Sequence, residues 1–284
     1  MKLTILIAVY NEAATVGELL ERVWAQPVPM AEREIIVIES NSSDGSREQV
    51  VAFADRHADD PATRVMLILE DRPRGKGHAI RRGLAAARGD VILIQDADLE
   101  YEVGDYPQLL VPICEGRAAF VIGSRHLGPN RWRIRKMGGR WLQALALNLG
   151  GMLFHRFFNT VFATRLTDPT SMYKIFRLDC LHGSQLRCDR FDFDFELLGT
   201  LLRAGYMPLE IPVRYRSRGF DQGKKIRVLR DPWGWIATIL RVRLARFRGE
   251  SLRAARRRRT SAPFPGNSPQ DHSPRAAAFS RYPP

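Results

Sequence analysis

The 284-residue sequence has little cysteine and no long run of apolar residues. Its three cysteines, Cys114, Cys180 and Cys188, are odd in number and show no metal-site spacing, which predicts reduced, mostly buried thiols and no disulfide framework. Residues 2–9 are too short for the apolar region of a signal peptide, and no segment offers the roughly 18 apolar residues of a membrane span. We therefore expect a cytoplasmic protein without a transmembrane helix.

Acidic residues are fewer than basic ones, and the formal net charge is +13. Residues 249–284 contain seven arginines and two acidic residues, Glu250 and Asp271, and so have a net charge of +5. The preceding residues therefore carry +8. The excess indicates an anionic partner, which could be a phosphate-bearing substrate, an anionic membrane surface or nucleic acid. Nucleic-acid binding would leave the carboxylate segment described next without a role. Deleting the residues after 249 would separate the two readings, because only tail-mediated binding would vanish.

The segment from Asp90 to Glu100 joins a buried strand to a cluster of carboxylates. Residues 91–94 form a short apolar run typical of a central parallel strand. Asp96, Asp98 and Glu100 follow it, where an α/β sheet normally binds its ligand. Because Mg²⁺ prefers oxygen ligands and is held by one or two carboxylates together with substrate phosphates, the Asp-x-Asp pattern predicts a metal-diphosphate site. The alternative is a solvated loop whose aspartates cap the next helix.

Strand-like and helix-like segments alternate along the first half of the chain. Apolar strands are expected at residues 3–9, 34–38, 65–69, 91–94 and 120–122. Helical patterns follow these strands, and one of them begins at Gly75-Lys76-Gly77, which lacks the spacing of a phosphate-binding P-loop. The alternation predicts an α/β fold of three layers, with a mostly parallel central sheet and helices on both faces. No glycine-rich basic loop follows the first strand, which argues against a nucleotidyltransferase.

The second half has a different pattern. Residues 139–163 form a long apolar helical stretch, which is either a core helix bending at Gly150-Gly151 or an amphipathic helix in a membrane interface. A strand, a helix and a further strand are expected at residues 172–176, 195–204 and 207–215. The sequence then predicts a main domain over residues 1–230, a basic amphipathic helix over 231–248 and a disordered arginine-, proline- and serine-rich tail over 249–284.

Polar side chains follow several of the predicted strands and should meet at one edge of the sheet. The residues concerned are Tyr10, Glu12, Glu39, Asp96, Asp98, Arg125, Asp194, Glu196, Arg218 and Lys224. Glu39 could accept a hydrogen bond from an N–H group of a nucleobase, and Tyr10 could pack against the same base. Asp194 and Glu196 have a simpler alternative, since acidic residues favour the N-terminal dipole of the helix that begins there.

An ordered set of motifs carries a family resemblance over residues 3–230. The motifs are Val9-Tyr10-Asn11-Glu12, Asp44-Gly45-Ser46, Asp96-Ala97-Asp98, Gly123-Ser124-Arg125, Asp168-Pro169-Thr170, Phe193-Asp194-Phe195-Glu196, and Arg218 with Gly223-Lys224-Lys225. In this set the sequence resembles inverting family 2 glycosyltransferases with a GT-A (Rossmann-like) fold. It is most similar to the branch of dolichol-phosphate mannosyltransferases and polyprenyl-phosphate glycosyltransferases.

The resemblance implies transfer of a hexose from a nucleotide sugar, of GDP-mannose or UDP-glucose type, to a polyprenyl or dolichyl phosphate at the cytoplasmic membrane face. It places Mg²⁺ or Mn²⁺ on Asp96, Asp98 and Glu100. It places the nucleotide sugar on Ala8, Tyr10, Glu12, Ile38, Glu39, Asp96, Ala97, Asp98, Arg125, Arg218 and Lys224. The catalytic set is Asp98, Asp194, Arg218 and Lys224. The alternative acceptor is a hydroxyl, which would need Asp194 as general base.

The sequence departs from the family pattern in several places. Ala8 stands where many members have proline, and Glu39-Ser40 replaces a usual pair of aspartates. Glu100 stands where some relatives carry glutamine, which favours metal binding. The hydrophobic C-terminal spans of some relatives are absent, so we expect a peripheral association with the inner face of the membrane rather than a membrane anchor.

Overall fold

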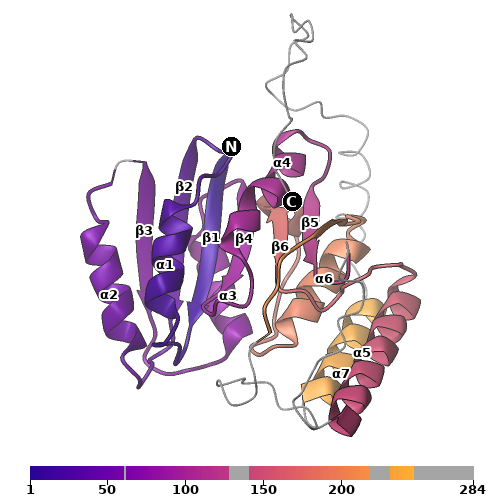
Figure 1. Cartoon of the computed structure of the whole chain (residues 1–284). Helices are drawn as coiled ribbons and strands as arrows, with labels where there is room; N and C mark the ends of the chain where they lie inside the picture. Colours follow the sequence, from indigo (N-terminus) through magenta and orange to yellow (C-terminus); the bar gives the residue numbers. More distant parts are fainter. Residues whose placement is uncertain (61, 128–140, 218–230, 246–284) are drawn as a thin grey trace, which may run out of the picture.

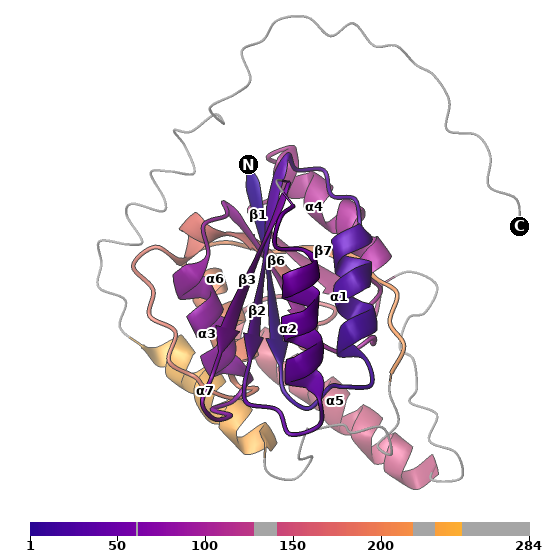
Figure 2. The ribbon, with the colours of Figure 1, turned by 90° about the vertical axis from the view of Figure 1, so that its left-hand side faces the viewer.

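The computed structural model describes residues 1–60, 62–127, 141–217 and 231–245. They form an α/β structure of three layers, in which a central sheet is covered by helices on both faces (Figures 1 and 2). This arrangement confirms the predicted fold class. The predicted tail over residues 249–284 lies outside the described residues, and the predicted division into domains stays a prediction.

The described strands form one seven-stranded sheet in the order β3-β2-β1-β4-β6-β5-β7. Six of them run in the same direction, and β6 is antiparallel to both of its neighbours, β4 and β5. The bounds are β1 Lys2–Val9, β2 Glu32–Glu39, β3 Thr63–Leu69, β4 Val91–Asp96, β5 Phe120–Ser124, β6 Lys174–Arg177 and β7 Leu209–Pro212.

Helices α1, α2 and α4 cover one face of the sheet, and α3 and α6 cover the other (Figure 2). Their bounds, with those of the 3₁₀ helices η1 and η2, are α1 Val16–Ala25, α2 Ser46–Arg56, α3 Lys76–Ala86, η1 Val103–Asp105, α4 Tyr106–Cys114, α5 Trp141–Phe162, η2 Leu178–Leu181, α6 Phe193–Arg203 and α7 Asp231–Leu244. Since both faces are covered, β1 is apolar on both sides: Ile5 and Ile7 pack under α1, and Leu6 packs under α3.

Helices α5 and α7 lie side by side beyond α6, at the far end of the sheet from β3 (Figure 1). On α5, Phe158 is fully buried whereas Leu153 is 67% exposed, and on α7 Trp233 is 73% exposed. Helix α5 thus has a core face and an exposed apolar face, and it continues through Gly150 and Gly151. A position of this helix in a membrane interface stays a prediction. Within the described residues, none of the helices has the length and apolar character needed to cross a bilayer.

The structure differs from the sequence-based expectation at the last strand. A strand was expected over residues 207–215, but β7 ends at Pro212, whose ring nitrogen has no hydrogen to donate. The chain beyond it pairs elsewhere, because Tyr215 forms an antiparallel bridge with Tyr101 in the loop after β4. This pairing brings a late segment of the chain to the carboxylate-rich loop.

Candidate functional site

The carboxyl ends of β1, β2 and β4 bring the predicted site residues together. In the parallel register Ala8 lies opposite Ile38 on one side and opposite Asp96 on the other, and Val9 lies opposite Glu39. The chain leaves β1 toward β2 and β3 on one side and returns as β4 on the other. This is the switch point where open α/β sheets bind ligands.

Hydrogen bonds between loops fix this edge. Asn11 has a positive φ of 49°, and its backbone N–H donates to Ser42 Oγ at 2.9 Å. The backbone N–H of Glu12 donates to Ser46 Oγ at 2.8 Å, and Thr15 Oγ1 donates to the carbonyl of Ala97 at 3.0 Å. The loops after β1, β2 and β4 therefore hold one another, while the Tyr10 side chain is 38% exposed at the edge.

Asp96 is paired with Lys76, the first residue of α3. Burial alone would lower the pKa of Lys76, but Asp96 and Asp194 raise it, so this lysine is a protonated counter-ion. The sequence predicted only a turn and a helix start at Gly75-Lys76-Gly77. The helix start is confirmed, and the role of Lys76 was missed because no P-loop spacing marked it.

Asp194 and Lys174 form a second, deeper pair. Asp194 Oδ1 lies 3.9 Å from Lys174 Nζ, accepts no hydrogen bond from the described residues and is buried. Burial raises the pKa of Asp194, although Lys76 and Lys174 act to lower it. Burial lowers the pKa of Lys174, which is fully buried on β6 and donates to the carbonyl of Ser171. Asp194 is thus close to the predicted site.

Glu196, its neighbour on α6, has a structural role. Its Oε2 accepts hydrogen bonds from the backbone N–H groups of Arg187 and Cys188, at 2.8 and 2.7 Å. Its Oε1 lies 3.2 Å from Arg241 on α7. Glu196 therefore ties the loop before α6 to α7.

The predicted metal ligands Asp98 and Glu100 lie in the loop after β4. Asp98 Oδ1 accepts a hydrogen bond from the backbone N–H of Glu100 at 3.0 Å, and Glu100 Oε2 accepts one from the Tyr215 hydroxyl at 2.7 Å. Burial raises the pKa of Tyr215 to about 12, so its phenol is a proton donor at neutral pH. The carboxylate oxygens of these predicted ligands are of the type that a hard divalent metal ion takes. In this structure, however, Asp96 is paired with Lys76, and Asp96, Asp98 and Glu100 do not form a group of three converging ligand atoms among the described residues. A metal ion held by these three residues therefore stays a prediction.

Both carboxylate oxygens of Glu39 are bound by groups of the protein itself. It is fully buried, its Oε1 accepts the backbone N–H of Ser42 at 2.6 Å, and its Oε2 accepts that of Asn41 at 3.2 Å. Arg47 on α2 forms an ion pair with the same oxygen. In this structure Glu39 therefore shapes the turn after β2. Contact with a base through Glu39 stays a prediction.

Arg125, predicted near the phosphates, is bound to Asp168. Nε and Nη2 of Arg125 donate to the two oxygens of Asp168 at 2.7 and 2.8 Å, and Nη2 also donates to Thr170 Oγ1 at 2.7 Å. Burial opposes the charge of each partner, but the pairing raises the pKa of Arg125 and lowers that of Asp168. Arg218 and Lys224, also predicted for the site, lie outside the described residues.

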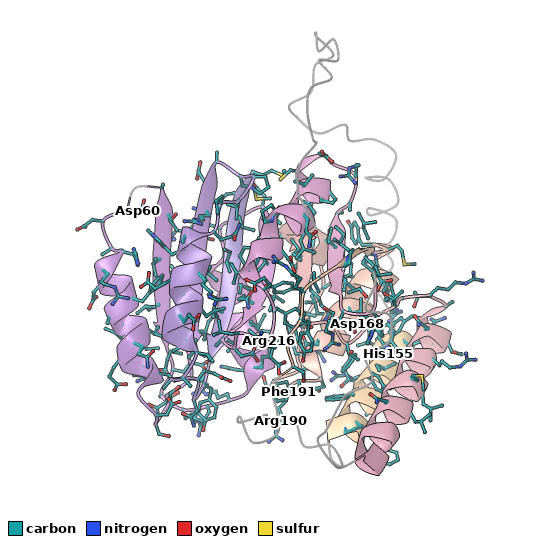
Figure 3. All side chains as sticks on the ribbon, in the orientation of Figure 1. Asp60, His155, Asp168, Arg190, Phe191 and Arg216 are labelled. Carbon is teal, nitrogen blue, oxygen red and sulfur yellow. The ribbon has the colours of Figure 1, made fainter. Side chains whose placement is uncertain are left out.

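His126, His155 and Asp168 form another group that could hold a metal ion. One ligand atom from each lies within 4.8 Å of the others, and Figure 3 shows His155 on α5 close to Asp168. Burial lowers the pKa of His155 to about 4, so its imidazole is neutral. Asp168, however, accepts hydrogen bonds from the Arg125 side chain and backbone and from Thr170, which fill its four lone-pair positions. A metal ion at this group would have to displace Arg125.

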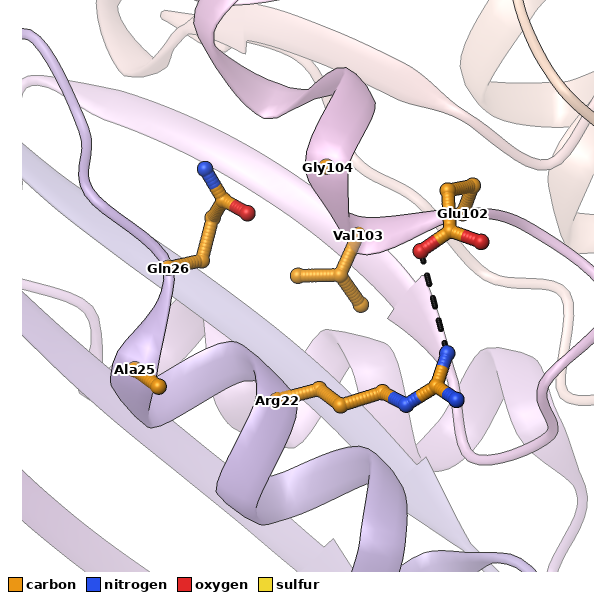
Figure 4. Close-up of a pocket in the computed structure, with 6 residues that line it drawn as sticks. All are labelled: Arg22, Ala25, Gln26, Glu102, Val103 and Gly104. Carbon is orange, nitrogen blue, oxygen red and sulfur yellow. Dashed lines mark ion pairs between the residues drawn. The ribbon is translucent and has the colours of Figure 1, made fainter.

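A hollow elsewhere on the surface carries none of these residues. It has a volume of about 290 Å³ and is lined by Arg22, Ala25 and Gln26 of α1 and its end and by Glu102, Val103 and Gly104 (Figure 4). Helix α1 runs back from the carboxyl edge toward the start of β2, so its C-terminal end is remote from Ala8 and Asp96. The candidate site is therefore defined by the loops at the carboxyl edge.

This edge, with its carboxylates and lysines at a switch point, is the ligand-binding edge of an open α/β sheet. Residues 4–181 match the family "Glycosyl transferase family 2", and the chain belongs to that family. Undecaprenyl-phosphate 4-deoxy-4-formamido-L-arabinose transferase of Enterobacter sp. (strain 638) is 26% identical over 226 residues, 78% of this chain and 62% of that protein. Dolichol-phosphate mannosyltransferase of Pyrococcus furiosus is 24% identical over 228 residues, 80% of this chain and 61% of that protein.

The chain thus spans about three fifths of the length of these relatives. Among solved structures, glucosyl-3-phosphoglycerate synthase from Mycobacterium tuberculosis with UDP has a TM-score of 0.58 at 22% identity and covers 87% of this chain and 82% of that one. The same synthase with Mn²⁺, UDP-glucose and phosphoglyceric acid has a TM-score of 0.57 at 18% identity, covering 87% and 81%. These likenesses confirm the GT-A fold.

The buried Arg125–Asp168 pair leads to a prediction about stability. The Arg125 side chain is 17% exposed and that of Asp168 is fully buried, so Asp168→Asn leaves a largely buried guanidinium without its counter-ion. We expect a loss of about 3–5 kcal/mol in the free energy of unfolding, measured by urea denaturation at pH 7. The control Asp71→Asn, in the exposed pair with Arg74, should leave the midpoint almost unchanged. An equal, small effect of both variants would contradict the assignment.

The same pair predicts a pH dependence. Because the folded-state pKa of Asp168 is lowered, its contribution is fully present above the unfolded carboxyl pKa, near 4. It is lost as the pH falls from there toward the lower, folded-state pKa. The difference in unfolding free energy between wild type and Asp168→Asn should therefore shrink below about pH 4 and stay constant from pH 5 to 7.

Proposed function

We propose that the chain is an inverting glycosyltransferase that moves a hexose from a nucleotide sugar, of GDP-mannose or UDP-glucose type, to a polyprenyl or dolichyl phosphate. The observation that carries the proposal is the register at the switch point, where Ala8, Ile38 and Asp96 are adjacent and Asp98 and Glu100 follow. Membership of glycosyl transferase family 2 supports the reaction type. The names of the two relatives support a polyprenyl-phosphate acceptor.

The donor would lie across the ends of β1, β2 and β4. Tyr10 is exposed enough to pack against a base, and the partly buried Ala8 would line the floor beside it. Ile38 is fully buried next to Ala8 and would support this floor from within the core. Lys76 stands next to Asp96 and can turn its ammonium toward a diphosphate. We therefore add Lys76 to the donor-binding residues. In Arg125, Nη1 takes part in none of the hydrogen bonds to Asp168 and Thr170 described above, and this group could meet a phosphate.

Asp96, Asp98 and Glu100 would hold Mg²⁺ or Mn²⁺, because three carboxylates offer the oxygen ligands that both ions take. When bound, the ion would neutralise charge on the diphosphate leaving group. In the reaction an acceptor phosphate oxygen forms a bond to the anomeric carbon, and the bond from that carbon to the diphosphate breaks with its electron pair going to the nucleoside diphosphate. A phosphate monoester is largely dianionic at neutral pH, so no side chain needs to remove a proton.

A hydroxyl acceptor is the second candidate, and one observation favours it. Asp194 carries a buried oxygen that accepts no hydrogen bond within the described part of the chain, and burial raises the pKa of this carboxyl group, as in many general bases. A hydroxyl would give up its proton to Asp194 as it attacks the anomeric carbon. The nucleotide sugar, the leaving group and the metal site would be the same.

The protein would bind peripherally to the cytoplasmic face of the membrane, and the site would act at that surface. Helices α5 and α7 expose apolar side chains, Leu149, Leu153, Trp233, Leu240 and Leu244. Exposed arginines of the same helices include Arg156 and Arg243. Apolar side chains with basic residues at their rim suit the interface of an anionic bilayer.

Donor binding is tested by thermal shift with GDP- and UDP-sugars, with and without Mn²⁺ or Mg²⁺. We expect one nucleotide class to raise the melting temperature, and to raise it further with metal, because a ligand that binds the folded state stabilises it by mass action. Asp98→Asn should lose the metal-dependent part and the transferase activity. Asp90→Asn, at the opposite end of β4, is the control and should behave as wild type. The same metal-dependent shift in both variants would exclude Asp98 as a ligand.

The acceptor class is tested by three substitutions. With a polyprenyl phosphate, Asp194→Asn should keep measurable transfer, whereas Arg218→Ala or Lys224→Ala should raise the acceptor KM or lower kcat at least tenfold, about 1.4 kcal/mol, since each removes positive charge that draws in a phosphate. The opposite ranking, an inactive Asp194→Asn with a nearly normal Arg218→Ala, would identify a hydroxyl acceptor.

Membrane association is tested by co-sedimentation with vesicles containing anionic lipid. Binding should be strong at low salt and weaken as salt screens the charges. Replacing Leu153 and Trp233 by serine should reduce binding several-fold, because both side chains are mostly exposed on the α5 and α7 surface. Leu69→Ser is the control, since Leu69 is 49% exposed but lies on β3 at the other end of the sheet. Equal binding by all variants would show that α5 and α7 do not make the contact with the membrane.

A further inference from the structure

A tyrosine in the segment that follows β7 contacts a predicted metal ligand. Tyr215 donates its hydroxyl hydrogen to Glu100 Oε2 at 2.7 Å. The contact is part of a short antiparallel pairing of two distant segments. In it, the backbone N–H of Arg216 donates to the carbonyl of Glu100 at 2.7 Å, and that of Glu102 donates to the carbonyl of Arg214 at 3.3 Å. The backbone therefore fixes Tyr215 directly opposite the loop that carries the carboxylates.

The ring of Tyr215 is also held by two neighbouring side chains. The guanidinium carbon of Arg125 lies 5.0 Å from the ring centroid, and the ring of Tyr101 packs against it edge to face at 5.0 Å. Arg125 is in turn fixed by its ion pair with Asp168. A phenylalanine would keep both ring contacts and lose only the hydroxyl. The substitution Tyr215→Phe would therefore remove the hydrogen bond to Glu100 while keeping the ring in place.

We propose that Tyr215 is a positioning residue of the metal site, whose hydroxyl holds the Glu100 carboxylate in the orientation that meets Mg²⁺ or Mn²⁺. The inference rests on the proposed function, in which Glu100 is a metal ligand. A glutamate side chain that is fixed before binding loses less conformational freedom when the ion arrives. Partners that orient a ligating carboxylate typically change metal affinity about 10–100-fold when they are removed.

Asp98 is oriented by a comparable contact from the backbone, since its Oδ1 accepts the N–H of Glu100. The two carboxylates are therefore fixed by different parts of the chain, Asp98 by its own loop and Glu100 by Tyr215. The segment that contributes Tyr215 precedes Arg218 by three residues and Lys224 by nine. The residue that orients a metal ligand is thus close in sequence to the basic residues proposed for the acceptor phosphate.

The test measures Mn²⁺ binding directly, by electron paramagnetic resonance of free Mn²⁺ in titrations of the full chain with GDP or UDP present. Tyr215→Phe should weaken Mn²⁺ binding about tenfold or more and raise the Mn²⁺ concentration for half-maximal activity, with kcat at saturating metal little changed. Tyr106→Phe is the matched control, because it removes a buried tyrosine hydroxyl that donates to Gln95 Oε1 at 2.9 Å, beside the site but not on a ligand. It should leave Mn²⁺ affinity as in wild type.

A double-mutant cycle shows whether Tyr215 acts through Glu100. In a Glu100→Ala background, Tyr215→Phe should cause no further loss of Mn²⁺ affinity, since the carboxylate that it orients is gone. A wild type that binds Mn²⁺ while Tyr215→Phe binds it equally well would overturn the positioning role and leave the proposed function standing. Equal losses in Tyr215→Phe and Tyr106→Phe would also overturn it. A wild type that binds no Mn²⁺ with either nucleotide would overturn the proposed metal site itself.

Discussion

Charge compensation among buried side chains is the constraint on which the carboxyl edge of the sheet depends. Asp96 lies close enough to Asp194 to raise the pKa of Asp194, and removing water from a carboxylate costs several kcal/mol unless an opposite charge is near. Lys76 and Lys174 supply that charge from α3 and β6. The arrangement therefore requires α3 to begin at Lys76 and β6 to enter the sheet beside β4. The register of the strands and the electrostatics of the site support each other.

The two halves of the chain contribute different parts of this edge. The parallel unit from β1 to β4 provides the carboxylates Asp96, Asp98 and Glu100. The later half provides Lys174 on the antiparallel strand β6, Arg125 after β5, and the tyrosine hydroxyl that meets Glu100. The antiparallel insertion of β6 between β4 and β5 makes this possible, since it places Lys174 next to the strand that ends in Asp96. A purely parallel continuation would put a helix crossover between these strands.

The sequence predicts the scaffold well because apolar runs and turn residues are local signals. It also predicts that Glu39 and Asp96 lie at one edge, since parallel strands end at the same edge, and the family resemblance adds Ala8 to this edge. It does not reveal which side chains pair, because the Lys76–Asp96 and Tyr215–Glu100 contacts join residues 20 and 115 positions apart. The sequence offers many basic and aromatic residues as possible partners. The right ones are identified only from the register of β6 and from the pairing of Tyr101 with Tyr215.

For Glu39 and Arg125 the sequence predicts the location but not the ion pair that each side chain forms. Both lie where the sequence places them, yet Glu39 pairs with Arg47 and Arg125 pairs with Asp168. A buried charge without an opposite charge nearby would destabilise the folded state by the free energy of its desolvation. Both side chains are therefore paired within the protein when no ligand is bound. Under the proposed function, donor binding at this edge would be an exchange of partners, in which Asp96 would help to hold the metal ion and the ammonium of Lys76 would turn to the diphosphate. The affinity for the donor would then be the difference between two sets of ion pairs, and Asp96 and Lys76 would contribute to both.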